Sequence, residues 1–248
     1  YQASYSKVKD EVDYCYFVPP NKKKVCVDIG SNMGAFIHRM AEHDAFEEIY
    51  GFEPSFQTYH ASLSILGELE ILNPNHRIFN LAVADKTGEI YTLFDGGDGE
   101  SGGASLLPSQ KSTQKENCMS ISLDDIFDLV QTDYIDYLKI DCEGAELAIL
   151  QNSKRLGDIG AMMVECHYVD GEDTTPHIIQ LLNANGFHVN CFTTVDNTED
   201  ANHADRLKGA QPVVFALDLK KYQEDYAGWH RLGVVDEESM EVSIGDIE

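Results

Sequence analysis

Acidic and glycine-rich segments follow the predicted strands of this chain, and their side chains could bind a nucleoside and move a proton. In chain order these segments are Asp28-Ile-Gly30-Ser-Asn32-Met-Gly34, Glu53, residues 82–85, Asp141-Cys-Glu143-Gly144 and Glu165-Cys-His167. A glycine turn between a strand and a helix frees backbone N–H groups and lets a ligand approach closely. A carboxylate can accept the hydroxyls of a ribose, and an imidazole with an ordinary pKa of about 6.5 can act as a general base.

The first two segments together indicate a nucleoside-containing cofactor. Glu53 follows Asp28 by 25 residues and ends the next predicted strand, where a carboxylate can hold both hydroxyls of a ribose. The turn reads G-x-N-x-G, whereas a nicotinamide dinucleotide normally requires G-x-G-x-x-G. Asp28 lies two residues before the first glycine of the turn, and its negative charge disfavours the pyrophosphate of such a dinucleotide. No G-x-x-x-x-G-K-[ST] segment is present either. An anion at this edge suits the ammonium group of S-adenosylmethionine.

Alternating strands and helices must position these segments. The apolar patterns predict strands over residues 25–29, 48–52, 77–83, 119–123, 134–140, 161–166, 187–194 and 212–217, with a further extended segment over 89–94. Helices are expected over residues 34–43, 56–66, 124–130, 143–152 and 174–185, with Ser55 as the N-cap of the second. The repeated β-α-β order predicts a mainly parallel sheet with helices on both faces, in which ligands bind beyond the carboxyl ends of the strands.

Length and pattern favour a single domain. We expect it to span residues 1–248, with a core over about 22–218, an N-terminal appendage over 1–20 and an acidic C-terminal tail over 219–248. Residues 95–105 hold five glycines and predict a loop, either a surface linker or a lid over the substrate.

Charge and cysteine usage limit the partners and the compartment. The 18 Lys and Arg against 43 Asp and Glu give a formal net charge of −25, which repels phosphate backbones and anionic lipids, so we expect no nucleic-acid or membrane partner. The polar start of the chain predicts no signal peptide, and no apolar run is long enough to cross a membrane. None of the six cysteines forms a CxxC pair, and Cys26, Cys166 and Cys191 lie in predicted strands. We therefore expect buried, reduced thiols and a cytoplasmic location.

A series of segments in this chain resembles the FkbM family of S-adenosylmethionine-dependent methyltransferases. The segments are VDIGSNMGAF, GFEPS, NLAVADKTGEIY, GGASLL, ISLDDIF, IDYLKIDCEGAELAIL and MMVECH, over about residues 25–168, and KIDCEGAE (Lys139–Glu146) is the most distinctive. The resemblance implies the class I methyltransferase fold, a Rossmann-like α/β sandwich whose mostly parallel seven-stranded sheet has an antiparallel last strand. It also implies methylation of a hydroxyl on a sugar or a small natural-product-like acceptor. The cofactor-binding residues carried over from the resemblance are Asp28, Gly30, Asn32, Gly34, Glu53, Ser55, Ala82, Asp141 and Glu143.

Two hypotheses account for the activation of the acceptor. In the first, His167 is the general base, and Glu165 and Asp141 lie beside it. In the second, Asp141, Glu165 and His167, with Glu143 close by, hold Mg²⁺ or Mn²⁺, which lowers the pKa of the acceptor hydroxyl. A different role for Glu143 is that of a first-turn carboxylate that stabilises the following helix.

Other functions stay open at this stage. They are a methyltransferase that acts on protein or nucleic acid, a non-catalytic domain that only binds S-adenosylmethionine, and a nicotinamide-dependent dehydrogenase. The sequence does not predict the oligomeric state.

Overall fold

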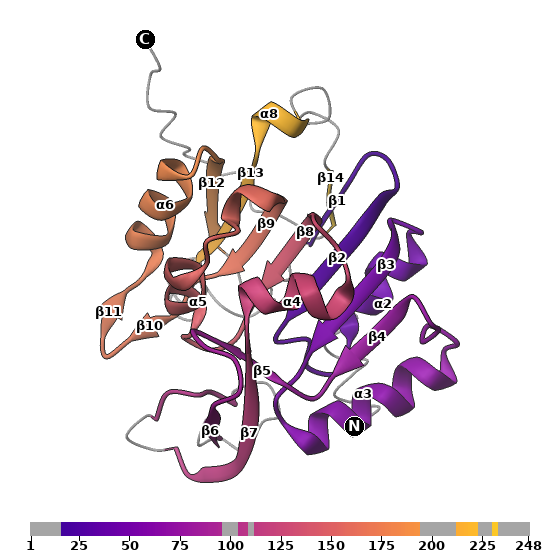
Figure 1. The fold of residues 1–248 in the computed structure, drawn as a ribbon, viewed down its shortest axis with the longest axis vertical. Helices are drawn as coiled ribbons and strands as arrows, with labels where there is room; N and C mark the ends of the chain where they lie inside the picture. Colours follow the sequence, from indigo (N-terminus) through magenta and orange to yellow (C-terminus); the bar gives the residue numbers. More distant parts are fainter. Residues whose placement is uncertain (1–15, 96–103, 109–111, 194–211, 223–229, 233–248) are drawn as a thin grey trace, which may run out of the picture.

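A seven-stranded sheet forms the centre of the computed structural model, which describes residues 16–95, 104–108, 112–193, 212–222 and 230–232 (Figure 1). The strand order is β12-β13-β9-β8-β2-β3-β4. The bounds are β2 (Lys23–Ile29), β3 (Phe46–Phe52), β4 (His76–Phe79), β8 (Ile135–Ile140), β9 (Ile159–Glu165), β12 (His188–Thr193) and β13 (Pro212–Leu217). Only β13 runs antiparallel to its neighbours β9 and β12. The predicted mostly parallel sheet with an antiparallel last strand is confirmed.

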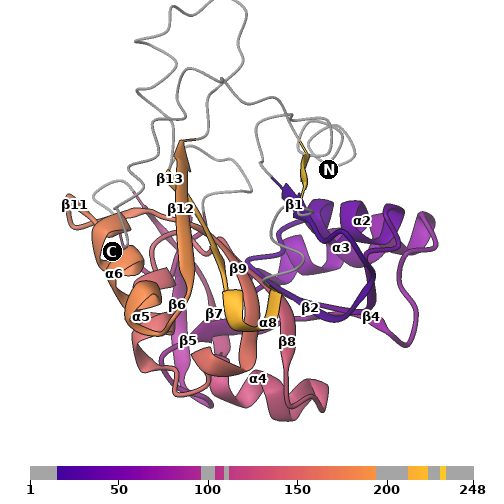
Figure 2. The same cartoon turned by 90° about the horizontal axis from the view of Figure 1, so that it is seen from above.

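Helices cover both faces of this sheet (Figure 2). One face packs against α2 (Ala35–Glu42) and α3 (Phe56–Glu68), and the other packs against α4 (Leu123–Val130), α5 (Glu146–Asn152) and α6 (Thr175–Ala184). Strand β2 contributes to both layers because successive side chains point to opposite faces. Val25, Val27 and Ile29 belong to the core under α4, α5 and α6, whereas Cys26 belongs to the core under α2 and α3. Ser55 caps α3 as predicted, since its side chain accepts a hydrogen bond from the N–H of Thr58.

A second, three-stranded sheet lies beside the carboxyl ends of the main strands (Figure 1). It consists of β5 (Ala82–Ala84), β7 (Gln114–Ser122) and β6 (Ile90–Phe94), in that order. The single strand predicted over residues 77–83 is therefore wrong, because the chain leaves the main sheet after Phe79. The Asn80 side chain donates to the carbonyls of Glu53 and Pro54, at 2.9 and 3.0 Å, which ties this crossing to the segment after β3.

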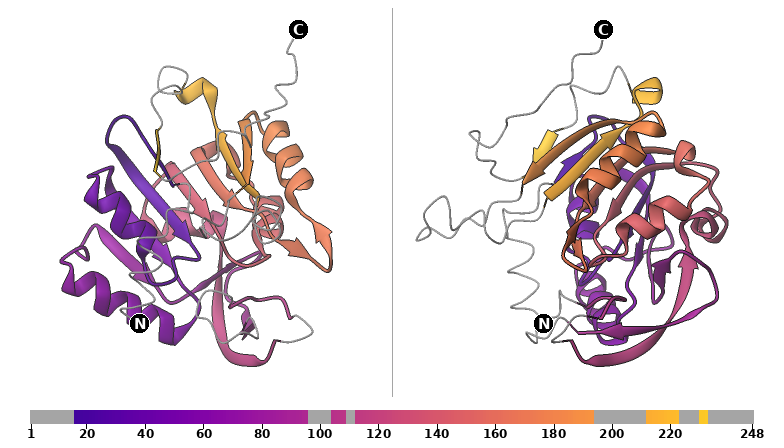
Figure 3. Two further views of the ribbon diagram at one scale, coloured as in Figure 1. Left: turned by 180° about the vertical axis from the view of Figure 1, so that it is seen from behind. Right: turned by 90° about the vertical axis from the view of Figure 1, so that its left-hand side faces the viewer.

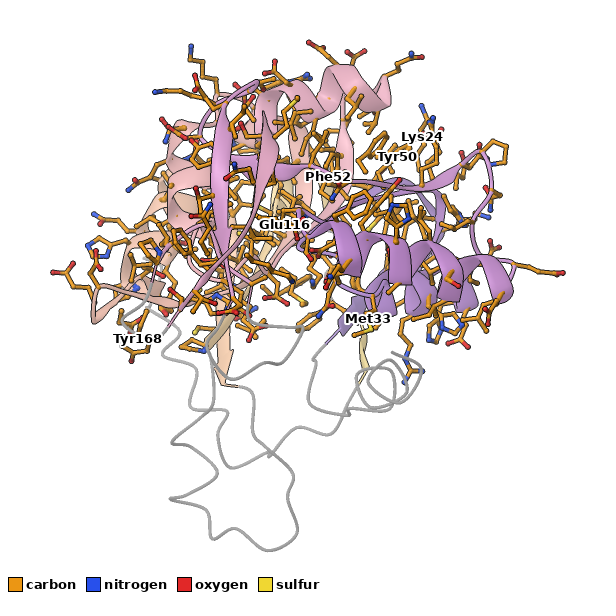
Figure 4. The ribbon with its side chains drawn as sticks, turned by 90° about the horizontal axis from the view of Figure 1, so that it is seen from below. Lys24, Met33, Tyr50, Phe52, Glu116 and Tyr168 are labelled. Atoms are coloured by element: carbon orange, nitrogen blue, oxygen red, sulfur yellow. The ribbon has the colours of Figure 1, made fainter. Side chains whose placement is uncertain are left out.

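Strand β7 also contacts the start of α3. Glu116 of β7 lies near this helix in Figure 4, and its two carboxylate oxygens accept from the N–H of Phe56 at 3.2 and 3.3 Å. A carboxylate is favourable there because the N-terminus of a helix carries a partial positive charge. The second sheet is thus attached to the main sheet through the element that follows Glu53.

The two ends of the described chain meet in a small sheet (Figure 3). Strand β1 (Tyr16–Val18) pairs antiparallel with β14 (His230–Leu232), and the ring of Phe17 stacks on that of Phe215 in β13 at 4.0 Å. Part of each predicted appendage is therefore a strand. Residues 233–248 of the acidic tail and residues 96–103 of the glycine loop lie outside the described residues.

The remaining short elements are β10 (Tyr168–Val169), β11 (Glu172–Asp173), the 3-10 helix η1 (Leu156–Asp158) and α8 (Leu219–Tyr222). The five cysteines in the described part of the chain are free thiols. Cys26 and Cys166 are buried as expected, but Cys191, in the edge strand β12, is exposed. No helix in the described ranges is both long and apolar enough to span a membrane.

Candidate active site

A cavity opens where β2, β3 and β8 end, between the main sheet and the second sheet. Its lining residues are Ile29, Gly30, Asn32, Phe52, Glu53, Pro54, Ala82, Val83, Leu93, Ala104, Leu106, Asp141, Cys142 and Glu143. Six of the predicted cofactor-binding residues are among them: Gly30, Asn32, Glu53, Ala82, Asp141 and Glu143. The other three, Asp28, Gly34 and Ser55, do not line it.

The glycine turn brings the end of β2 close to the end of β8. Gly30 has a φ of 76°, in the left-handed region, and a Cβ there would lie 1.7 Å from the carbonyl oxygen of Asp141. Asn32 is also left-handed, with a φ of 48°, and the Oδ1 atom of its side chain is buried without a hydrogen-bond partner. Gly34 begins α2 and faces Leu66, so its role is the packing of α2 on α3.

Glu53 is held by the two loops on either side of the cavity. Its Oε2 atom accepts from the N–H of Asn32 at 3.0 Å, and its Oε1 atom accepts from the N–H of Ser55 at 2.8 Å. The side chain is buried, and burial raises its pKa to about 7, despite the opposing effect of these two hydrogen bonds. Ser55 therefore orients Glu53 through its backbone rather than by lining the cavity.

Asp28 faces a lysine instead of the cavity. Its carboxylate is fully buried, and its Oδ1 atom lies 3.1 Å from the ammonium of Lys139, which also lies 3.4 Å from Oδ2 of Asp141 and donates to the carbonyl of Gly30. Burial raises the pKa of Asp28, and the lysine opposes this rise. The expected contact of Asp28 with a cofactor ammonium stays a prediction, and the cation beside Asp28 in this structure is Lys139. The sequence signal for the pair of Asp28 and Lys139 is the occurrence of a lysine inside the apolar strand IDYLKI.

Glu146 is not among the site residues expected from the sequence, although it is the last residue of the KIDCEGAE segment. In the structure it contacts His167. It is fully buried, and its Oε1 atom accepts from the N–H groups of Cys142 and Gly144, both at 3.1 Å, and lies 2.9 Å from Nδ1 of His167. Helix α5 begins at Glu146 rather than at residue 143, so the first-turn carboxylate is Glu146. Glu143 precedes the helix with a φ of 58°, and its Oε2 atom lies 3.4 Å from Nε2 of His167.

The acid–base residues converge at the ends of β8 and β9. Asp141, Glu165 and His167 each offer a ligand atom, and these atoms lie within 4.8 Å of one another. Burial lowers the pKa of His167, but Glu146, Glu143 and Asp141 outweigh this effect and raise it to about 10. The imidazole is therefore protonated at neutral pH in this arrangement, unlike the neutral base that the sequence predicts. Burial and the nearby Asp141 raise the pKa of Glu165.

The comparison with protein families identifies the family to which this chain belongs. The model of the methyltransferase FkbM domain matches residues 28–189, which is more than half of the chain. The chain belongs to the FkbM methyltransferase family. The family's methyl donor is S-adenosylmethionine, in agreement with the cofactor expected from the sequence. No curated protein matches this chain.

Several solved structures are similar to this chain. An FkbM methyltransferase from Methylobacillus flagellatus KT is 15% identical, with a TM-score of 0.53 over 87% of this chain and 50% of that chain. M. capricolum TrmK, solved with S-adenosylhomocysteine, is 10% identical, with a TM-score of 0.48 over 87% and 67% of the two chains. Aeropyrum pernix fibrillarin, solved with S-adenosylmethionine, is 11% identical, with a TM-score of 0.46 over 87% and 74%. This chain spans half the length of the first of them, and the TM-score of 0.53 with that structure supports the class I methyltransferase fold.

Proposed function

We propose that this FkbM methyltransferase binds S-adenosylmethionine in the cavity at the ends of β2, β3 and β8 and methylates a hydroxyl oxygen of a small-molecule or glycan acceptor. The observation that supports the proposal most is Glu53, a buried carboxylate that lines the cavity and is oriented by two backbone N–H groups. When bound, S-adenosylmethionine supplies a methyl group made electrophilic by its sulfonium. The protein's part is to position the acceptor and take up its proton.

The lining of the cavity fits this cofactor. Each oxygen of Glu53 keeps a lone pair for a ribose hydroxyl, because the N–H groups of Asn32 and Ser55 occupy one each. The unpartnered Oδ1 atom of Asn32 offers a further acceptor. Ala82 and Val83 present apolar surface suited to an adenine ring. Asp141 and Glu143 are the anionic groups of the lining that suit the ammonium end of the cofactor.

Acidic groups also favour a neutral acceptor. Asp141 and Glu165 lie beside the cavity and the chain carries a formal charge of −25, so a phosphate backbone would be repelled. An alcohol loses its proton as its oxygen is methylated, and the carboxylate of Asp141, which lines the cavity, is placed to receive that proton. Sugars and other polyhydroxylated molecules are therefore the acceptor class that we propose.

Replacing Glu53 tests the cofactor site. The Glu53→Gln variant should bind S-adenosylhomocysteine about 10- to 100-fold more weakly, because a hydrogen bond to a charged group contributes about 1.5–3 kcal/mol. Isothermal titration calorimetry measures this affinity. Glu47→Gln is the matched control, since Glu47 is an exposed residue of β3, the strand that Glu53 follows, and the affinity of this variant should not change. Equal affinities for the two variants would remove Glu53 from the site.

The same carboxylate should make cofactor binding depend on pH. The pKa of Glu53 is raised to about 7, so a fall in pH from 8 to 6 protonates it and removes the charge that accepts the ribose hydroxyls. We expect the affinity for S-adenosylhomocysteine to fall about tenfold over this range. Calorimetry at several pH values measures the slope, and the Glu53→Gln variant should lack it. A slope that persists in this variant would assign the pH dependence to another group.

Turnover identifies the class of acceptor. Release of S-adenosylhomocysteine from S-adenosylmethionine should rise with mixtures of sugars and polyols and stay at background with bulk RNA or unfolded protein. Turnover with RNA or protein alone would overturn the proposed acceptor class. Binding of NAD in place of S-adenosylhomocysteine would overturn the cofactor.

A further inference from the structure

We propose that Asp141, Glu165 and His167 bind a divalent metal cation, Mn²⁺ or Mg²⁺, beside the acceptor. The inference rests on the proposed function in one respect, since the cation would bind the same acceptor hydroxyl. The three side chains come from the ends of two neighbouring strands, β8 and β9, and their ligand atoms lie within 4.8 Å of one another. Two carboxylates and one imidazole form a donor set suited to these cations.

Glu165 gives the second, independent observation. Its side chain is only 8% exposed, and its Oε2 atom is buried without a hydrogen-bond partner. A buried carboxylate without a partner is costly, and the neighbouring carboxylate of Asp141 adds repulsion. A divalent cation between the two would compensate both charges. The unpartnered oxygen therefore points to a ligand rather than to a purely structural role.

The surroundings of His167 match those of a metal-binding histidine. Nδ1 of His167 lies 2.9 Å from the carboxylate of Glu146, which is itself fixed by the N–H groups of Cys142 and Gly144. Metal-binding histidines commonly donate their second ring N–H to a carboxylate, which sets the tautomer and the orientation of the ring. A metal at the other nitrogen, Nε2, would displace the proton that this nitrogen carries in the metal-free arrangement, and the carboxylate of Glu143, 3.4 Å from Nε2, is a further donor.

Lys139 limits the geometry of this site. Its ammonium lies 3.4 Å from Oδ2 of Asp141, on the side of that carboxylate that faces Asp28. The cation would therefore use the other oxygen of Asp141. Metal coordination would lower the pKa of the acceptor hydroxyl.

Titration with MnCl₂, followed by the electron paramagnetic resonance signal of free Mn²⁺, tests the site. The titration needs about 0.15 M salt, because a chain with 43 acidic residues attracts cations without specificity. We expect one strong site per chain that Mg²⁺ competes for. Glu165→Gln and His167→Gln should each weaken Mn²⁺ binding at least about tenfold. Glu146→Gln, which removes the carboxylate that orients His167, should weaken it about 10- to 100-fold. The exposed control Glu47→Gln should bind like the wild type.

Two further measurements keep the outcomes distinct. Thermal unfolding of the wild type with and without MnCl₂ should show an increase in Tm that His167→Gln lacks, which covers the case that one variant fails to fold. Titration with S-adenosylhomocysteine tests the proposed function separately. Normal binding of S-adenosylhomocysteine with no strong Mn²⁺ site, or with a site that persists in both Glu165→Gln and His167→Gln, would overturn the metal site alone. Loss of cofactor binding with an intact Mn²⁺ site would overturn the proposed function alone.

Discussion

The Lys139→Met variant is expected to lose about 3–5 kcal/mol of unfolding free energy, because it leaves Asp28 buried without its cation. Asp28 is fully buried, and the ammonium of Lys139 at 3.1 Å is its ion-pair partner. The same ammonium lies between Asp28 and Asp141, so its removal also brings two carboxylates into unscreened repulsion. Denaturation by urea, followed by circular dichroism, measures the loss.

A double variant separates charge from packing. Asp28→Asn combined with Lys139→Met removes both charges and should recover most of the lost stability, since replacing a whole buried ion pair is much less costly than breaking it. The exposed pair of Lys22 and Asp44 provides the control, and Lys22→Met should cost at most about 1 kcal/mol. A Lys139→Met variant as stable as Lys22→Met would show that Asp28 does not depend on its lysine.

The Gly30→Ala variant should be destabilised by about 2–5 kcal/mol for a steric reason. The added Cβ would lie 1.7 Å from the carbonyl oxygen of Asp141, and a backbone atom of a central strand end cannot move aside as a flexible side chain can. The left-handed φ of 76° adds about 1–2 kcal/mol for any L residue, and overpacking adds about 1–3 kcal/mol. Urea denaturation measures the effect.

Gly67→Ala is the matched control for this substitution. Gly67 lies within α3, and a Cβ there would meet no atom within 4 Å. Alanine should therefore stabilise the protein by about 0.5–1 kcal/mol, because it favours a helix over glycine. Since Gly30 and Asp141 both line the cavity, Gly30→Ala should also weaken binding of S-adenosylhomocysteine, whereas Gly67→Ala should not. Equal stability of the two variants would contradict the close approach of β2 and β8.

The two proposals assign different work to the two sides of one cavity. Glu53 and the glycine turn, which follow β3 and β2, bind the ribose side of the cofactor. Asp141 and Glu143 after β8 lie between the ammonium end of the cofactor and the acceptor, and the side chains at the end of β9 lie on the acceptor side. Helix α5 links them, because Glu146 at its start holds His167 while Glu143 just before it lines the cavity. A change at Glu146 should therefore act on His167 directly and on the loop of Cys142 and Glu143 that lines the cavity.

The sequence by itself determined the alternation of strands and helices, because hydrophobic period and capping are local properties. It placed Ser55 at the N-cap of α3, which is confirmed, and it placed Glu53 where a strand ends, and the structure has Glu53 directly after β3. It also placed acidic groups after β8 and β9, since the carboxyl ends of parallel strands share one edge of a sheet. The FkbM segments carried the family assignment, which the family comparison confirmed.

Only the tertiary structure decided which of these groups pair with one another. Lys139 and Asp28 lie 111 residues apart and meet because β8 and β2 are neighbours, a contact that no local pattern encodes. The chain leaves the main sheet at Asn80, whose side-chain amide donates a hydrogen bond to the carbonyl of Glu53, after β3. Glu146 reaches His167 across 21 residues because α5 starts beside the end of β9. Charge states and ion pairs depend on such non-local distances and on burial, and both arise only when the chain is packed.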